Sequence, residues 1–269
     1  MSGAETLMNY EGPLRTKAGG CFPGERAVFR GYDLHREFKN AEWIDLYIFS
    51  ITGRRLTTTQ LKVLQGVWVY TSYPDPRLWN NRVAAMAGSA RGTGSQALGA
   101  AIATSEAAIY GRQPEISVAD FLVRALKRTE AGERLEDVIR QELAQRKRLL
   151  GYGRPVATLD VDERIPVTLD LMRQEGIAIG PHLKLAFEIE TALSAIAARP
   201  LPMTYSAMVT AIPLDMGFTP MECYLYMQPC FVAGMIPCYL EALERPAGAT
   251  FMLRCEHLHY DGPGRRNWE

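Results

Sequence analysis

The chain has 269 residues, with thirty basic and thirty acidic side chains, 47% hydrophobic residues and 22% charged residues. This length fits one large domain or two modest ones, and the balanced charge indicates neither a nucleic-acid partner nor an anionic membrane. Five cysteines form no even-numbered disulfide framework, and the first residues lack a secretion-signal pattern. The longest apolar run, 230–240, is too short to span a bilayer. We therefore expect a cytoplasmic protein with reduced thiols.

The first third of the chain changes from an irregular pattern to a helical one. Residues 1–30 are rich in glycine, proline and charge and are predicted to form an irregular arm. The apolar segment 41–52 is a predicted helix that ends at Gly53, because glycine is a common residue after the last helical turn. One of the threonines 57–59 is expected to cap the next helix, since threonine is favoured at that position.

The segment 80–110 is dense in alanine, glycine, serine and threonine. Small side chains let helix backbones approach closely, so buried and tightly packed helices are predicted there. The Gly-Thr-Gly turn at 92–94 could alternatively cradle a phosphate. No strand pattern precedes this turn and the full dinucleotide fingerprint is absent, so the packing interpretation is favoured.

Later segments are also helical in pattern. Residues 135–150 form an amphipathic helix that is predicted to end at Gly151, and its charged face, including Glu142, is expected to be solvated. Pro181 suits the first position of a further helix. The last apolar helical region is 205–243, and a polar loop follows it. The sequence therefore predicts an all-α protein.

Three blocks of sequence recur together in one protein family. The blocks are 151–156 (Gly-Tyr-Gly-Arg-Pro-Val) with 162–164 (Asp-Glu-Arg), 205–207 with 231–241, and Arg254 with 260–262. In order and rough spacing they resemble the citrate synthase and citryl-CoA lyase family. The first block is similar to the family's glycine–aromatic–glycine–histidine loop and the Asp-Pro-Arg that follows it. The resemblance extends from about residue 30 to residue 265.

The resemblance implies a citrate-synthase-like fold, an all-α homodimer with a large and a small helical domain and the active-site cleft between them. It assigns 1–110 and 215–269 to a discontinuous large domain, and 111–214 to the small domain. The chain is closer in size to citryl-CoA lyases than to full-length citrate synthases.

The family's catalytic residues are replaced in this chain. In the family, an aspartate deprotonates acetyl-CoA, one histidine supports the enol and a second polarises the keto group of oxaloacetate. The enol-supporting histidine corresponds to Tyr110, the loop histidine to Arg154 and the aspartate to Met203. Methionine cannot remove a proton, so the family's condensation should be very slow. Tyr110 and Arg154 either stabilise an oxyanion in a rebuilt site or are remnants of a disused cleft.

Substrate binding is also altered. Phe231 replaces one carboxylate-binding arginine, and Pro76 replaces a substrate histidine. By the resemblance, Arg164 and Arg254 match arginines that hold carboxylates. Arg164 has an alternative as a surface ion pair with the acidic residues around it, which would contribute little to stability. Met203 and Tyr205 complete the predicted substrate-binding set.

Other reactive side chains have both a functional and a structural interpretation. His257 lies in the tail that reaches the partner subunit's site in the family, so it is a candidate proton carrier, although a dimer contact is favoured. His257 and His259 lack a third convergent ligand for zinc, and no metal is expected. Glu222 is either a substitute base or a helix-surface carboxylate, and His182 is interpreted as a capping or core residue. The cysteines of the C-terminal third are interpreted as packing residues rather than nucleophiles.

The favoured function is that of a carbon–carbon bond lyase or acyltransferase acting on a carboxylated substrate, with or without a CoA link. A retro-aldol, retro-Claisen or decarboxylation step suits the lost aspartate better than condensation does. CoA would enter as part of an acyl-CoA substrate, and no cofactor is expected. One alternative is CoA-independent hydration, cyclisation or isomerisation of a small organic acid, which the apolar Met203 and Phe231 favour. The other is a catalytically inactive homologue that binds a metabolite.

Overall fold

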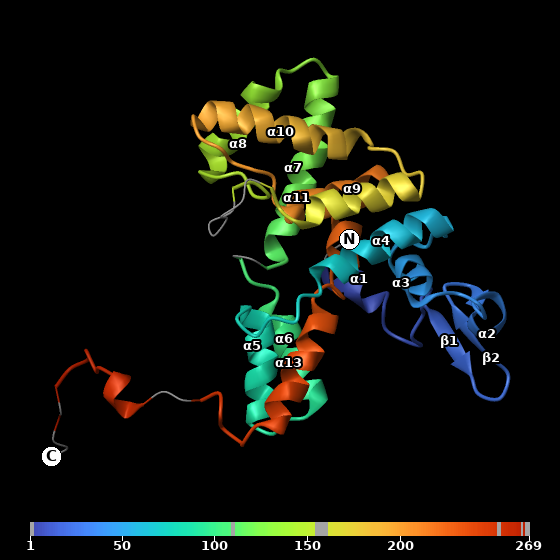
Figure 1. Ribbon diagram of the computed structural model, residues 1–269. Helices are drawn as coiled ribbons and strands as arrows, with labels where there is room; N and C mark the ends of the chain where they lie inside the picture. Colours follow the sequence, from blue (N-terminus) through green and yellow to red (C-terminus); the bar gives the residue numbers. More distant parts are fainter. Residues whose placement is uncertain (1–2, 109–110, 154–160, 252–253, 265, 267–269) are drawn as a thin grey trace. The chain divides into compact units, whose positions relative to one another are not determined.

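The computed structural model describes residues 3–108, 111–153, 161–251, 254–264 and 266. The chain divides into two compact units, Met1–Thr57 and Thr58–Glu269. Helices dominate the described residues, and the only sheet among them has three short strands (Figure 1). The predicted all-α class is therefore confirmed. The assignment of 1–110 with 215–269 and of 111–214 to two domains stays a prediction.

The first unit holds the sheet, which the sequence did not predict. Its elements are α1 (Gly3–Met8), β1 (Gly19–Phe22), β2 (Arg26–Phe29), β3 (Tyr32–Asp33), α2 (Leu34–Glu37) and α3 (Trp43–Thr52). The strands are antiparallel in the order β1-β2-β3, and Gly19 pairs with Phe29. The predicted irregular arm over 1–30 is thus wrong for α1 and for the two strands within it. Strands of four residues are too short to show a clear alternation of apolar and polar side chains.

An aromatic cluster and a glycine cap explain the rest of this unit. The centroid of the Phe38 ring lies 5.1 Å from that of Phe49 and 6.4 Å from that of Phe29. The helix α3 and the sheet therefore share one small core. The helix α3 ends as predicted at Gly53, which has a φ of 69° and donates its N–H to the Phe49 carbonyl. A left-handed residue at this position is a common way to end a helix.

In the second unit, α4 (Thr58–Thr71) packs on α9 (Arg164–Gln174), and three helices form a tightly packed group. These are α5 (Trp79–Ser89), α6 (Gly94–Thr104) and α13 (Val232–Glu244). A Cβ on Gly88 would lie 2.6 Å from the Tyr239 carbonyl oxygen, so only glycine permits this approach. Close packing over 80–104 is therefore confirmed. The turn at 92–94 supplies Thr93, which forms a capping box with Gln96 at the start of α6.

The remaining helices pack on α11 or, in the case of α8, on α7 and α10. They are α7 (Gln113–Glu130), α8 (Leu135–Arg146), α10 (Pro181–Ala197), α11 (Tyr205–Asp215) and α12 (Pro220–Tyr226). The helix α11 is buried from Ala207 to Leu214, and it contacts α7, α9, α10 and α12. Pro181 begins α10 as predicted. The Asp215 carboxylate accepts the backbone N–H groups of His182 and Leu183, and His182 Nδ1 lies 2.9 Å from it. His182 is thus part of a helix cap, as predicted.

Two details of α8 differ from the prediction. The helix ends at Lys147, with a φ of 59°, rather than at Gly151. Its Glu142 is buried, not solvated, because the guanidinium groups of Arg124 and Arg146 bind the carboxylate at 3.1 and 3.0 Å.

The C-terminal tail contains one short 3₁₀ turn, η1 (Cys255–His257), and its described residues are exposed. None of the helices described in the structure combines the length and the apolar character that a membrane span requires.

Candidate active site

Arg164, which the Asp-Glu-Arg motif predicts to be a site residue, is the first residue of α9. The Asp162 carboxylate forms a clamp on its guanidinium by two hydrogen bonds. The Nε and Nη2 atoms of Arg164 each donate to the Asp162 carboxylate at 2.8 Å, one to each oxygen. The Asp162 side chain is 1% exposed and that of Arg164 is 19% exposed. Burial alone would lower the pKa of Arg164, but the hydrogen bonds to Asp162 raise it above its ordinary value. The guanidinium is therefore a permanent cation with one edge already in use.

Two tyrosine rings flank this guanidinium. The Arg164 Cζ atom lies 4.5 Å from the centroid of the Tyr205 ring and 5.6 Å from that of Tyr73. Cations are attracted to aromatic faces at such distances. The Tyr205 hydroxyl lies 2.8 Å from Thr168 Oγ1, and the Tyr205 backbone N–H donates to the Asp162 carboxylate. Arg164 and Tyr205, both predicted site residues, are thus direct neighbours, and Asp162 joins the starts of α9 and α11.

Tyr73 is a site residue that sequence reasoning missed. Its hydroxyl donates to Glu163 Oε1 at 2.9 Å, and burial followed by this hydrogen bond raises its pKa. Its backbone carbonyl accepts a hydrogen bond from Asn81. A Cβ on Gly234 would lie 2.5 Å from the same carbonyl oxygen, so the start of α13 lies against this segment. The sequence offered one indication of this role. Tyr73 closely precedes Pro76, where the resemblance places a substrate histidine.

Met203 links residues 151–153, the glycine-containing loop of the first sequence block, to the start of α11. It forms an isolated antiparallel bridge with Tyr152, and both side chains are buried. The backbone N–H of Gly153 donates to Pro202, and that of Thr204 donates to Gly151. Two of the sequence blocks that carry the family resemblance therefore meet here. The apolar Met203 side chain supplies no proton acceptor to this region.

A second arginine, Arg112, is fully buried at the start of α7 and was not predicted. Its Nε donates to the Met227 carbonyl at 3.0 Å, and its Nη2 donates to those of Gln228 and Cys230 at 2.6 and 2.8 Å. The Phe231 ring lies 5.5 Å from the Arg112 Cζ atom, and Phe231 has a φ of 73°. The predicted substrate residue Phe231 is therefore positioned by Arg112. The Arg112 Nη1 atom is buried and has no hydrogen-bond partner among the described residues.

Glu115 lies on the first turn of the same helix and is also buried. Its Oε2 atom has no hydrogen-bond partner within the part of the chain that the structure describes. Burial raises the pKa of Glu115 to about 8, with Arg112 opposing the shift and Glu106 adding to it. Arg112 and Glu115 follow Tyr110 closely in the sequence, yet charged residues in a helix are normally interpreted as solvated, which is why they were missed.

The remaining predicted site residues fall into two groups. Tyr110 and Arg154 lie outside the described residues, and their roles stay predictions. Arg254 and His257 lie in the tail with side chains 78% and 64% exposed. Arg254 pairs with Glu256 at 3.1 Å, and His257 Nε2 lies 3.9 Å from the same carboxylate. Their substrate-binding and proton-carrying roles also stay predictions.

The other candidate nucleophiles and bases lie in buried or helix-capping positions. Burial raises the pKa of Cys230 to about 12 and also raises that of Cys223, so both thiols stay protonated. Glu222 forms a capping box with Thr219 at the start of α12. Among the described residues, no three His, Cys, Asp or Glu side chains are grouped to hold a metal ion.

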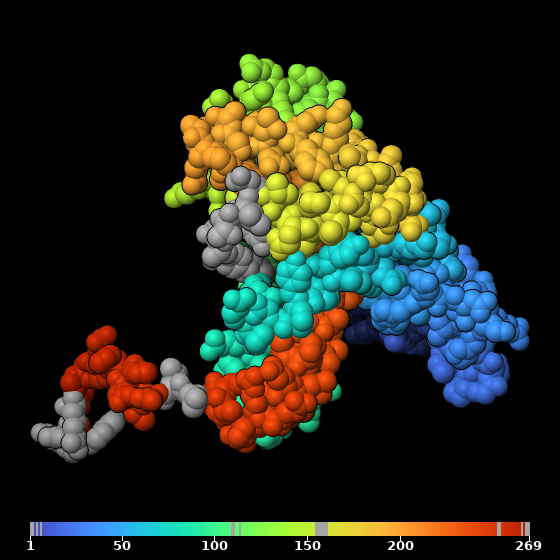
Figure 2. Space-filling view, viewed as in Figure 1, coloured from blue at the N-terminus to red at the C-terminus, as the bar shows by residue number. Residues whose placement is uncertain are grey.

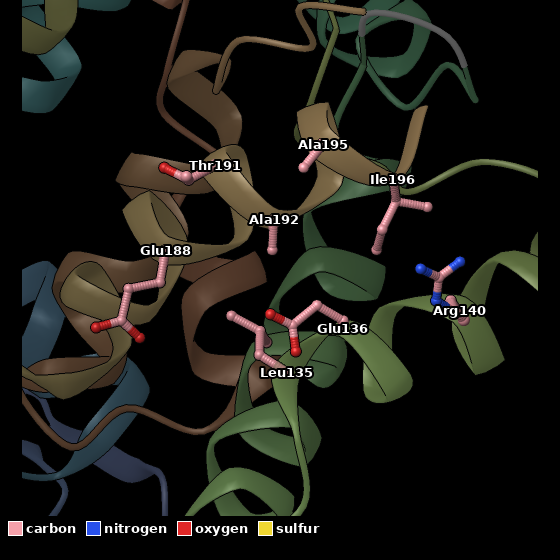
Figure 3. Close-up of a pocket in the computed structure, with 8 residues that line it drawn as sticks. All are labelled: Leu135, Glu136, Arg140, Glu188, Thr191, Ala192, Ala195 and Ile196. Carbon is pink, nitrogen blue, oxygen red and sulfur yellow. The ribbon is translucent and has the colours of Figure 1, made fainter. Parts of the chain in front are cut away.

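A separate open hollow of about 570 Å³ lies between α8 and α10 (Figure 3). Glu188 and Arg140 lie on opposite sides of it in this view. It is lined by Leu135, Glu136, Arg140, Glu188, Thr191, Ala192, Ala195 and Ile196. None of these is a predicted site residue, so the hollow is not part of the candidate active site.

Known proteins were compared with the chain by sequence and by structure. No protein-family model and no curated protein matches the sequence. The structure is similar to citryl-CoA lyase from Hydrogenobacter thermophilus, with a TM-score of 0.80 and 18% identity over 95% of this chain and 97% of that one. It is also similar to ATP citrate lyase from Methanosaeta concilii in complex with (3S)-citryl-CoA, with a TM-score of 0.69 and 14% identity. That match covers 98% of this chain and 44% of the other.

A third similar structure is citrate synthase from the archaeon Thermoplasma acidophilum, with a TM-score of 0.62 and 12% identity over 85% of this chain and 59% of that one. These similarities show that the chain has the citrate-synthase-like fold. The family resemblance in the sequence is thereby confirmed in the fold.

Proposed function

We propose that the protein is an enzyme of the citrate synthase superfamily, a carbon–carbon bond lyase acting on a carboxylated, CoA-linked substrate. The observation that carries the proposal is Arg164, held by Asp162 between Tyr73 and Tyr205 with one edge of its guanidinium still free. A partly buried cation with aromatic walls is suited to bind a carboxylate. The similarity to a citryl-CoA lyase over nearly the whole of both chains supports the same class of reaction.

Cleavage begins at the substrate's hydroxyl group, not at a carbon–hydrogen bond. In a retro-aldol step, the tertiary hydroxyl releases its proton to water and its oxygen forms a carbonyl. The adjacent carbon–carbon bond breaks, and its electron pair becomes the enolate of the released thioester, which then takes up a proton from water. Because the thioether of Met203 can neither remove nor deliver a proton, water supplies this last proton in the proposal. We assign Tyr110 and Arg154 to stabilise the developing oxyanions and Arg164 to hold a carboxylate.

A homodimer is part of the proposal. Ala233, Ile236 and Leu240 follow each other at helical spacing on α13, and the last two side chains are 41% and 50% exposed. Met86 of the adjacent α5 is 42% exposed. In the space-filling view the surface of α13 lies open beside α5 (Figure 2). Burial of these side chains against a second copy would remove apolar area from water. The free cysteines support a cytoplasmic location.

Binding of CoA thioesters tests the proposal. We expect citryl-CoA or a related 3-hydroxyacyl-CoA to bind the purified protein in calorimetry. Binding should weaken at least about tenfold in Arg164→Ala, since a charge-assisted hydrogen bond of about 1.5–3 kcal/mol is lost. The matched control is Arg173→Ala, because Arg173 lies on the same helix with its side chain 76% exposed. If no CoA compound binds, the CoA-linked lyase is wrong, and a CoA-free reaction or an inactive homologue takes its place.

A further inference from the structure

We propose that Thr168 is a positioning residue of the candidate active site, and that it holds the Arg164 guanidinium in place through the hydroxyl group of Tyr205. The inference rests on the proposed function, because Arg164 is the residue proposed to hold the substrate's carboxylate. Thr168 carries no charge and lies outside the sequence blocks that carry the family resemblance. Its role follows from the hydrogen bonds and the ring contact that join α9 to α11.

The hydrogen bonds of Thr168 have only one possible direction. Its Oγ1 atom lies 2.8 Å from the backbone carbonyl oxygen of Arg164, one turn earlier on α9, and 2.8 Å from the Tyr205 hydroxyl oxygen. A carbonyl oxygen can only accept, and a threonine hydroxyl has a single proton, so Thr168 donates to the Arg164 carbonyl. The Tyr205 hydroxyl therefore donates to Thr168. The order of donation is from Tyr205 to Thr168 and from Thr168 to the carbonyl of Arg164.

Burial makes this pair of hydroxyl groups depend on each other. Thr168 is 0% exposed and Tyr205 is 2% exposed. Burial raises the pKa of Tyr205 above its ordinary value, although Thr168 and Arg164 act in the opposite direction, so the phenol keeps its proton. A buried hydroxyl group that loses its acceptor bears the full cost of its lost hydration. The Tyr205 ring is therefore held where its hydroxyl reaches Thr168.

The fixed ring restrains the Arg164 side chain. The Tyr205 backbone N–H donates to the Asp162 carboxylate at 3.3 Å and the hydroxyl donates to Thr168, so Tyr205 is held at both ends. Between these two bonds, the centroid of its ring lies 4.5 Å from Arg164 Cζ, closer than the 5.6 Å of the Tyr73 ring. Asp162 holds one edge of the guanidinium, and the ring supports it from a second direction. Thr168 acts on the guanidinium through this ring.

The direction of donation also limits what Tyr205 can do in the proposed reaction. Its hydroxyl has one proton, and that proton is bound to Thr168. Tyr205 therefore positions Arg164 and does not protonate the enolate, in agreement with the proposed uptake of the last proton from water.

The reactivity of the Arg164 guanidinium measures its positioning without any substrate. Phenylglyoxal modifies arginine at its guanidinium nitrogens, and peptide mass spectrometry follows Arg164 alone. Thr168→Val keeps the branched shape of the side chain and removes the hydroxyl. We expect modification of Arg164 to become about fivefold faster, the ratio that corresponds to one hydrogen bond of ordinary net strength. Thr168→Ser keeps the hydroxyl and should restore the rate of the unaltered protein.

Thr210 offers a matched control for loss of a helix hydroxyl. It lies on α11, is 1% exposed, and its Oγ1 donates to the Ser206 carbonyl one turn earlier at 2.7 Å. Thr210→Val removes the same kind of bond as Thr168→Val and should also lower the urea midpoint. It should leave the modification of Arg164 unchanged. An equally fast modification in Thr210→Val would show a general loosening of the helices and would overturn the inference.

Tyr205→Phe removes the other hydroxyl of the pair and keeps the ring. It should speed the modification of Arg164 to the same extent, and Thr168→Val should add nothing further in the double variant. Additive effects would show that Thr168 acts through the Arg164 backbone instead, and would contradict the inference. If Thr168→Val does not fold, Tyr205→Phe decides, because an unchanged modification rate would show that the hydroxyl pair does not position Arg164.

Binding of citryl-CoA in calorimetry separates this inference from the proposed function. We expect Thr168→Val to weaken binding about fivefold, and Thr168→Ser and Thr210→Val to leave it unchanged. If the unaltered protein does not bind citryl-CoA, the modification rates still decide the role of Thr168. If it binds and Thr168→Val changes neither binding nor modification, the inference is wrong and the function stands. Faster modification with unchanged binding would support the positioning role and contradict carboxylate binding by Arg164.

Discussion

Arg112 is a buried arginine and Arg164 a partly buried one, both with carboxylates nearby, and they differ in what their nitrogen atoms contact. Arg164 is bound to a carboxylate, is 19% exposed and keeps one edge free. Arg112 is 0% exposed and is bound to three carbonyls of the connection between α12 and α13. A guanidinium that binds backbone carbonyls fixes a chain segment, whereas one that is already paired with an acid and still partly accessible can bind a ligand. The contacts of Arg112 are therefore those of a structural residue, whereas those of Arg164 are consistent with the proposed substrate-binding role.

The largest effect expected from this comparison is the loss of Arg112. Arg112→Met should destabilise the fold by about 3 kcal/mol or more, because carbonyls that the guanidinium satisfies would be left without a donor. Urea unfolding of the variant and of the parent measures the difference. Arg173→Met, at an exposed arginine, is the control and should leave the midpoint unchanged. An Arg112 variant as stable as the parent would contradict the structural role.

A smaller loss is expected at the clamp. Asp162→Ala leaves the Arg164 guanidinium without its partner and removes the acceptor for the Tyr205 N–H, so we expect a cost of about 2–3 kcal/mol. Glu163→Ala, at the neighbouring exposed carboxylate, should cost less than about 1 kcal/mol. Equal losses for the two variants in urea unfolding would show that the clamp is no more than a surface ion pair.

The pH dependence of stability reports on Glu115, whose backbone N–H donates to the Arg112 carbonyl. The pKa of Glu115 is raised from 4.5 to about 8. Between these values the folded protein keeps a proton that the unfolded chain releases, so stability falls as the pH rises, by at most about 1.4 kcal/mol per pH unit. Glu115→Gln should flatten this dependence between pH 5 and pH 8 in urea titrations. An unchanged slope would show that Glu115 is ionised in the folded protein.

Local signals in the sequence predicted much of the fold. Gly53 ended α3 and Pro181 began α10 as expected, because helix ends depend on the conformational limits of single residues. The small residues of 80–104 predicted close helix packing, which the approach of Gly88 to Tyr239 confirms. The family resemblance supplied the fold itself, and it also predicted Arg164 and Tyr205 as residues of one site.

Long-range contacts limited the prediction of the site. Arg112 and its carbonyl partners are separated by 115 to 118 residues, so nothing in the sequence near Arg112 distinguishes it from a surface arginine. The burial of Glu142 likewise depends on Arg124, which lies on another helix. Tyr73 was missed because its partner Glu163 is 90 residues away. Such burial and pairing are properties of the assembled helices, not of a local pattern.

We propose that Arg164 binds the carboxylate of a CoA-linked substrate that the protein cleaves. The most direct test is to incubate the purified protein with 3-hydroxy-3-methylglutaryl-CoA and with citryl-CoA, and to measure acetyl-CoA by chromatography. We expect acetyl-CoA to form from at least one of these thioesters, and its formation to be lost in Arg164→Ala but kept in Arg173→Ala. No acetyl-CoA from either thioester, or equal formation by both variants, would contradict the claim.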